Sequence, residues 1–205
     1  NVIGNVSKRS GLSDEYMTFL VIPIVGIVLV VSLYFLVYAP LQVNKLLIKA
    51  MSIGQLTQKM PITDAIKISQ DSFVEAISYD TLGVTEAREQ FLQMAPRLAQ
   101  IQIPPNTPNE SKIAFETSVR SFIKAVEDDI QVSNERHKND VRMLSIYGIF
   151  YNGVGDSASA ERVLKQAIAF APNKQLLSFD LTRAYLIQGK NEEAYQLYLD
   201  SLPAE

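Results

Sequence analysis

Cysteine and tryptophan are absent from this sequence of 205 residues, and His137 is its single histidine. The lack of cysteine excludes disulfides, thiolate zinc sites and a cysteine nucleophile, and it leaves the redox compartment open. One histidine argues against a histidine-based metal cluster and against a Ser-His-Asp triad within the chain. A net charge of only −3 gives no signal for nucleic-acid binding. We therefore expect no metal, no cofactor and no nucleic-acid partner.

Charged residues are also missing from positions 16–44, a stretch that contains a long run of Val, Ile, Leu and Phe at 17–38. As a helix this run is long enough to cross the hydrocarbon layer of a membrane, which is roughly 30 Å thick. The pattern predicts a transmembrane helix over residues 16–39 that contacts the lipid bilayer, preceded by a juxtamembrane segment, 1–15. A cleaved signal peptide is the alternative, but the apolar run is too long for one and no convincing cleavage site follows it.

The charges on either side of this helix disagree about its orientation. Lys8 and Arg9 precede it and favour a cytoplasmic amino end, whereas four lysines between residues 45 and 67 follow it and favour the reverse. We give weight to the first pair, and so expect a cytoplasmic N-terminal segment.

The last third of the chain matches itself at an offset of 34 residues. The shift superimposes two tyrosines, two glycines and two alanines, and brings Leu164 onto Tyr198. A period of 34 with small, bulky and proline positions in this order is typical of tetratricopeptide repeats, each a pair of antiparallel helices. It predicts repeats at 141–174 and 175–205, with an ordinary helical hairpin of accidental spacing as the alternative. The predicted repeat-core residues are Gly148, Tyr151, Gly155, Ala160, Leu164, Ala167, Pro172, Tyr185, Gly189, Ala194 and Tyr198.

The middle of the chain also has helical periodicity. Residues 40–103 form a degenerate helical-repeat region, in which Phe73 and Ala76 take the places of Leu164 and Ala167. A Pro- and Asn-rich loop at 104–110 separates it from the helical region 111–205. No segment has the period of two that a strand requires. The predicted fold is therefore all-α, one N-terminal transmembrane helix followed by a tetratricopeptide-like α-solenoid of helix hairpins.

Three features could suggest catalysis, and each has a plainer interpretation. The acidic run Glu127, Asp128 and Asp129 is interpreted as a solvated helix face, because its side chains point to different sides of a helix. His137 falls in a polar connector. The segment "GVGDSAS" at 153–159 lacks the preceding strand and the Lys-Ser/Thr pair of a phosphate-binding loop, and we interpret it as the turn between two helices. We expect no catalytic residue in this chain.

The concave face of the predicted repeats is the candidate binding site. The first helix of each pair lines that face, and arginines among apolar and amide side chains suit an extended peptide or an anionic group. A short helical spacer without a ligand is an equally good interpretation of two repeats. The candidate groove residues for a protein or peptide partner are Arg142, Ser145, Ile149, Asn152, Phe179, Arg183 and Leu186.

Three segments, read in order after the apolar helix, carry a resemblance to a known family. They are "APLQVNKLLIKAM", "FVEAISYDTLGVTEAREQFLQMA" and "AFAPNKQLLSFDLTRAYLIQGKNEEA". Over residues 17–200 the chain resembles the carboxy-terminal part of bacterial O-antigen ligase and polymerase family membrane proteins that carry a tetratricopeptide tail.

The resemblance implies a multi-span enzyme of the cell envelope that transfers a glycan from a polyprenyl-diphosphate carrier. The catalytic loop of that family lies between earlier membrane helices, so no catalytic residue carries over to this chain. The repeats would then be an exoplasmic appendage that binds an acceptor or a protein partner. A stand-alone single-pass tetratricopeptide adaptor is the alternative, and a small enzyme is a third hypothesis that lacks a nucleophile–base pair. The oligomeric state stays open.

Overall fold

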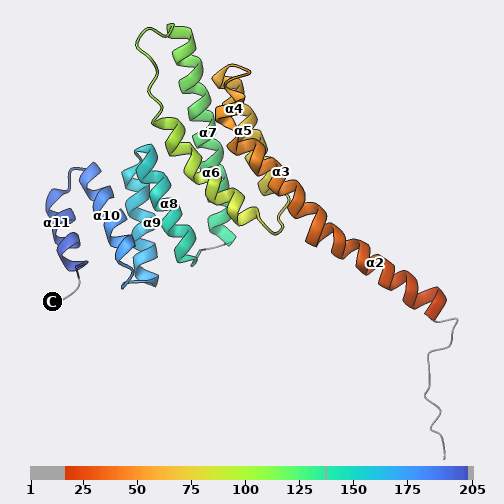
Figure 1. Cartoon of the computed structure of the whole chain (residues 1–205). Helices are drawn as coiled ribbons and strands as arrows, with labels where there is room; N and C mark the ends of the chain where they lie inside the picture. The colour runs from red at the N-terminus through yellow and green to blue at the C-terminus, as the bar shows by residue number, and fades with distance from the viewer. Residues whose placement is uncertain (1–16, 137, 203–205) are drawn as a thin grey trace, which may run out of the picture.

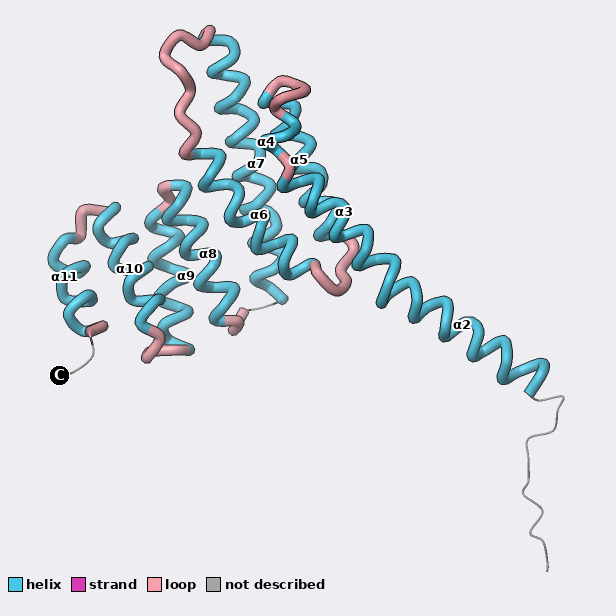
Figure 2. Tube along the Cα trace, in the orientation of Figure 1, coloured by secondary structure: helices cyan, strands magenta, loops and turns pink. Residues whose placement is uncertain are grey.

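The computed structural model describes residues 17–136 and 138–202, and every regular element among them is helical (Figures 1 and 2). The prediction of an all-α chain is confirmed for these residues. The predicted juxtamembrane segment 1–15 and His137 lie outside the described residues. In chain order the elements are η1 (Met17–Val21), α2 (Ile22–Leu33), η2 (Tyr34–Tyr38), α3 (Ala39–Met51), α4 (Ile53–Leu56), α5 (Ile62–Ser78), α6 (Val84–Ala99), α7 (Asn109–Arg136), α8 (Val141–Val154), α9 (Ser157–Phe170), α10 (Gln175–Ile187) and α11 (Asn191–Asp200).

The first four elements form one continuous helix, and its η1, α2 and η2 part projects away from the packed helices (Figure 1). The apolar side chains of this part are exposed, for example those of Ile27 (65% exposed) and Leu36 (64% exposed). Among the described residues this is the one helix long and apolar enough to cross a membrane, and it runs over Phe19–Met51. The predicted boundary at residues 39 and 40 therefore does not coincide with a helix end.

Two π-helical turns explain why the prolines do not break this helix. η1 ends two residues before Pro23, and η2 ends two residues before Pro40. Proline lacks an N–H and its ring collides with the carbonyl four residues earlier, so a regular α-helix kinks or ends there. A single π turn changes the hydrogen-bond register locally and lets the chain continue. In η2 the N–H of Ala39 donates to the carbonyl of Tyr34, five residues back.

α3 continues this helix into the body, where it packs mainly on α5. The hydroxyl of Ser69 donates to the carbonyl of Ala50 at 2.7 Å, and both residues are buried. Val43 forms a small buried cluster with Ala76 and Val84, which belong to α5 and α6. The apolar helix is therefore fixed to the body along its last turns.

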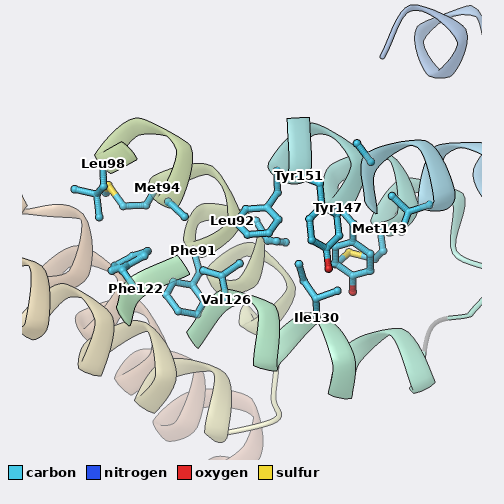
Figure 3. Close-up of a cluster of buried hydrophobic side chains, with 14 of the residues drawn as sticks. Phe91, Leu92, Met94, Leu98, Phe122, Val126, Ile130, Met143, Tyr147 and Tyr151 are labelled. Atoms are coloured by element: carbon cyan, nitrogen blue, oxygen red, sulfur yellow. The ribbon is translucent and has the colours of Figure 1, made fainter. Parts of the chain in front are cut away.

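The main core extends from α5 to α10 without a break. Its aromatic centre consists of Phe73, Phe91 and Phe122, whose ring centroids lie 5.0 to 6.2 Å apart. Figure 3 shows how the core continues from Phe122 past Ile130 to Tyr147. Tyr147 is fully buried, and its hydroxyl donates to Ser133 at 2.9 Å, which satisfies the polar end of the ring.

Helices α8 to α11 form two hairpins with similar turns. Gly155 and Gly189 have φ values of 88° and 74°, which a residue with a Cβ rarely adopts. In each turn the next N–H bonds back to a tyrosine carbonyl at 2.9 Å, from Asp156 to Tyr151 and from Lys190 to Tyr185. The two turn hydrogen bonds thus lie 34 residues apart, the same spacing as the sequence match. The interpretation of "GVGDSAS" as a turn is confirmed.

The predicted core residues of the first hairpin are better buried than those of the second. Ala160, Leu164 and Ala167 are fully buried, and α9 ends at Phe170, before Pro172. In the second hairpin Ala194 is buried, but Tyr198 is 43% exposed. The outer side of α11 has no neighbouring helix among the described residues, so its apolar side chains stay open.

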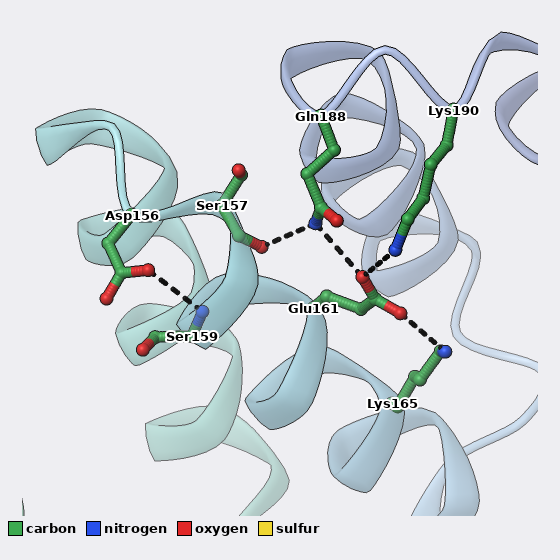
Figure 4. Close-up of polar contacts among 7 residues, drawn as sticks. All are labelled: Asp156, Ser157, Ser159, Glu161, Lys165, Gln188 and Lys190. Carbon is green, nitrogen blue, oxygen red and sulfur yellow. Dashed lines mark hydrogen bonds and ion pairs between the residues drawn. The ribbon is translucent and has the colours of Figure 1, made fainter.

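A carboxylate on α9 joins the two hairpins (Figure 4). Glu161 accepts from Lys165 at 2.6 Å and from Lys190 at 2.7 Å, and Gln188 bonds both Glu161 and the carbonyl of Ser157. The hydrogen bonds from Lys165 and then Lys190 hold the pKa of the Glu161 carboxyl down, from its ordinary 4.5 to about 2. The bridge helps to set where α10 stands relative to α8 and α9.

Gly148 allows α8 to lie directly against α9, so replacing it should lower the free energy of unfolding. A Cβ at this position would collide with the side chain of Leu164. We expect Gly148→Ala to destabilise the fold by about 1 to 3 kcal/mol, and by less in a Leu164→Ala background. The measurement is urea unfolding followed by circular dichroism. Gly54→Ala is the control, because open space surrounds Gly54. Equal stability of Gly148→Ala and wild type would contradict the close approach.

The Glu161 bridge should make stability depend on pH in the acid range. The folded pKa of Glu161 lies below its unfolded value, so its ion pairs stabilise the fold above about pH 4.5 and lose this contribution as the pH falls toward 2. Since both lysines are partly exposed, we expect Glu161→Gln to cost about 1 kcal/mol at neutral pH and less at about pH 3. Denaturant unfolding at both pH values measures this. Glu193→Gln, at an exposed position on α11, is the control, and a pH-independent cost of Glu161→Gln would refute the assignment.

Candidate functional site

Three helices that are distant in sequence enclose a cleft of about 280 Å³ on the body. α6 and α8 form its two walls and α10 contributes one side chain. Its floor is apolar, and its rim is polar and exposed. The lining residues are Leu92, Gln93, Pro96, Arg97, Gln100, Ile146, Ile149, Phe150 and Arg183.

A proline ring and a glycine bring the two walls together. Pro96 lies inside α6, and a Cβ at Gly153 of α8 would lie 2.7 Å from Cβ of Pro96. Only a residue without a side chain fits at this crossing. The contact sets the separation of the helices, and thus the width of the cleft.

The charges of the cleft are positive. Arg97 and Arg183 reach it from α6 and α10, and none of its lining residues is acidic. Neither arginine has an ion-pair partner within residues 17–136 and 138–202. Burial raises the pKa of the Asp180 carboxyl next to the cleft, and Arg183 opposes this shift. Two guanidinium groups with two glutamines offer planar donors for carboxylate oxygens or backbone carbonyls.

Ion pairs hold the wall helices in place at one end of the cleft. Arg88 of α6 pairs with Asp129 of α7 at 2.7 Å, and both side chains are largely buried. Glu89 of α6 pairs with Arg142 of α8 at 2.7 Å. The prediction of a solvated acidic face is wrong for Asp129, because Arg88 from 41 residues away covers it. Asp128, which is exposed and pairs with Lys124, fits that prediction.

The predicted groove residues separate into two groups in the structure. Ile149 and Arg183 line the cleft. Arg142 pairs with Glu89, and the amide of Asn152 donates to the carbonyl of Asp180 at 2.9 Å. These last contacts belong to the framework of the fold.

The other three predicted groove residues also lie outside the cleft lining. Ser145 is buried within the helix packing. Phe179 lies with its ring centroid 6.1 Å from that of Tyr198 on α11, and Leu186 is 55% exposed. Phe179 therefore helps to pack α10 against α11 within the second hairpin.

Sequence reasoning missed the α6 wall of the cleft. Gln93, Arg97 and Gln100 lie three and four residues apart, which places them on one face of a helix. The sequence alone could have identified that polar stripe. It could not have predicted that the stripe faces α8, because this depends on how two helices separated by α7 pack together.

A larger cavity of about 580 Å³ lies between the end of α6 and the start of α7, next to the predicted loop at 104–110. Its charges compensate one another only in part, since one acidic side chain, Glu116, lines it together with Lys112 and Arg120. The Nζ of Lys112 also donates to the carbonyl of Pro105 at 2.9 Å. The larger cavity therefore offers a ligand less unpaired charge than the cleft between α6, α8 and α10 does.

No group of three or more His, Asp or Glu side chains in the described part of the chain is arranged to hold a metal ion. The cleft itself contains no nucleophile paired with a general base. Its side chains offer guanidinium and amide donors and an apolar floor to a ligand.

No protein-family model matches this chain, and no curated protein or solved structure matches it.

Proposed function

We propose that the chain is a membrane-anchored, tetratricopeptide-like scaffold that is not itself catalytic. Its role is to hold an acidic segment of a protein partner in the cleft between α6, α8 and α10. The observation that carries this proposal is the convergence of Arg97 and Arg183 on one cleft that has no acidic lining residue.

Two further features support the scaffold. The equivalent turns at Gly155 and Gly189, 34 residues apart, fit a repeat of helix pairs. The exposed apolar helix that leads into α3 fits a membrane span and would keep the body next to the bilayer. We infer that the N-terminal segment is cytoplasmic and the helical body exoplasmic.

The shape of the cleft favours a peptide over a small metabolite. It is small and open to solvent at its rim, and two helices run along it, so a ligand gains contact by extending along the helices. Guanidinium groups at separate points along this path suit carboxylates spaced on an extended chain.

Charge reversal tests the cleft. We expect a photo-crosslinking amino acid at Ile149, which is 42% exposed, to form an adduct with an acidic protein segment in native membranes. Arg97→Glu or Arg183→Glu should lower the adduct yield about tenfold or more, because a hydrogen bond to a charged group contributes about 1.5 to 3 kcal/mol. Mass spectrometry identifies the crosslinked segment.

Arg162→Glu is the matched control, because Arg162 is exposed on α9 and does not line the cleft. An adduct that survives both cleft reversals, or a crosslinked segment without acidic residues, would refute the proposed binding mode.

The resemblance of the sequence suggests the wider setting. We propose that the scaffold is the tail of a cell-envelope glycan ligase or polymerase of the O-antigen ligase type, whose catalytic loop lies elsewhere. A stand-alone adaptor that recruits partners to an envelope complex is the alternative. Both use the same span and the same cleft.

Intact mass separates the two settings. We expect top-down mass spectrometry of the native membrane protein to give a mass far above 22.9 kDa, because a ligase tail needs the preceding membrane helices. A native mass near 22.9 kDa would exclude the ligase tail and leave the adaptor.

A further inference from the structure

The π turn at Tyr34–Tyr38 leaves one backbone carbonyl without its helical donor. The N–H of Ala39 already bonds the carbonyl of Tyr34, five residues back. In the same register the donor for the carbonyl of Phe35 would be residue 40, which is a proline and has no N–H. An unpaired carbonyl in an apolar helix costs several kcal/mol in lipid, so a substitute donor is needed.

The substitute comes from the turn between α5 and α6. The hydroxyl of Thr81 donates to the carbonyl of Phe35 at 3.3 Å, across 46 residues of sequence. In the same turn Gly83 has φ 93°, and a Cβ there would lie 3.5 Å from the side chain of Val43 in α3. Residues 79–83, here called the membrane-side turn, therefore lie directly against the apolar helix.

Sequence register places this contact at the level of the bilayer. A span needs about 20 residues, and the uncharged stretch available for it is 16–44. Wherever such a span is placed within that stretch, it contains Phe35 or ends next to it. A side chain that reaches the carbonyl of Phe35 thus reaches the hydrocarbon layer or its edge.

The residues around Thr81 suit this position. Leu82 in this turn is 64% exposed, so the described part of the chain leaves most of its side chain uncovered. Tyr79 belongs to the same turn, and in the apolar helix Tyr38 stacks on Tyr34 with ring centroids 5.5 Å apart. Tyrosines are typical of the interface between lipid and water.

The one acidic residue of the turn has an ion-pair partner at the end of α7. Asp80, with φ 45°, accepts from Arg136 at the end of α7 at 3.3 Å. An unpaired carboxylate beside Leu82 would oppose insertion into lipid, and this ion pair reduces that cost.

We propose that the membrane-side turn is a second membrane contact, which seats Leu82 in the interfacial layer of the bilayer beside the end of the span. This inference rests on the membrane anchoring proposed above. The turn would hold the helical body at a fixed height and rotation over the membrane, because Thr81 ties it to the span and Leu82 is held by lipid.

Single cysteines can test this in the full 205-residue chain, whose sequence contains no cysteine. An environment-sensitive fluorophore is attached at Leu82→Cys, and at Ile113→Cys as the control, in protein reconstituted into phosphatidylcholine vesicles. The two positions are equally exposed in the structure, 64% and 63%, but Ile113 lies near the start of α7, which is at the end of the body away from α2 (Figure 1). We expect aqueous iodide to quench the label at 82 several-fold less than the label at 113, and a lipid-borne quencher to act on 82 only.

A third label distinguishes failure of this inference from failure of the anchor. Val28→Cys lies in the middle of the apolar helix. If the label at 28 is shielded from iodide while the labels at 82 and 113 are quenched equally, the span holds and the membrane-side turn is refuted. If all three are quenched equally, the span and this inference both fail.

A second variant tests the role of Thr81 as a positioning residue. Thr81→Val removes the donor to Phe35 and keeps the shape of the side chain, so iodide quenching of the label at 82 should rise toward the level of the label at 113. The quenching at 28 should stay unchanged. A label at 82 that is equally shielded with and without the hydroxyl would show that the hydrogen bond does not position the turn.

Discussion

The need to satisfy backbone hydrogen bonds within an apolar helix is the constraint on which the rest of this structure depends. Water pairs with a free carbonyl in a soluble helix, but hydrocarbon does not. A proline such as Pro40 at the end of the apolar stretch would normally end the helix. The π turn before it carries the helix on into α3, and the carbonyl that is left over is paired by Thr81 from the body. A single missing N–H thus joins two parts of the chain that are far apart in sequence.

The rest of the body is positioned by contacts that extend from this helix. Val43 and Ala50 fix α3 to α5 and α6, and the phenylalanine cluster then joins α5, α6 and α7. The crossing of Gly153 over Pro96 sets α8 against α6, and the Glu161 bridge ties the last hairpin to the first. The apolar contacts and the Gly153 crossing are close approaches that leave little freedom, and the partly exposed Glu161 bridge adds to them. One of these contacts, the crossing at Pro96, forms part of the cleft wall, so the packing of α8 on α6 also sets the place of the cleft.

Local features of this chain were predictable from the sequence, whereas contacts between distant residues were not. The apolar helix, the absence of strand patterns and the turn at Gly155 follow from periodicity and residue type over short windows. The continuation through Pro40 did not follow, because a π turn has no sequence signature comparable to a helix cap. The partner of Asp129 lies 41 residues away, and a local reading treats such an acid as solvated.

The candidate site shows the same division. Ile149 and Arg183 were accessible to repeat reasoning, because both lie on first helices of predicted pairs. Arg97 was not, since α6 lies in a segment whose relation to the repeats depends on tertiary packing. Arg142 has the charge expected of a ligand-binding residue but is used in an ion pair with Glu89. Charge and helical face are therefore insufficient to distinguish binding residues from framework residues, and the distinction depends on which charges the fold leaves unpaired.

The distance from the membrane-side turn to the cleft limits which partners can bind in the proposed arrangement. α6 begins at Val84, directly after the turn, and its first cleft residue is Leu92. At 1.5 Å per residue the cleft starts about 12 Å along α6 and extends to about 24 Å at Gln100. A segment bound there remains within a few tens of ångströms of the lipid surface. A partner that is itself anchored in the membrane, with a short acidic extension, would reach this height without a long linker and would benefit from a high effective concentration. A freely diffusing protein would have to dock next to the bilayer, so the geometry favours partners of the membrane over partners in solution.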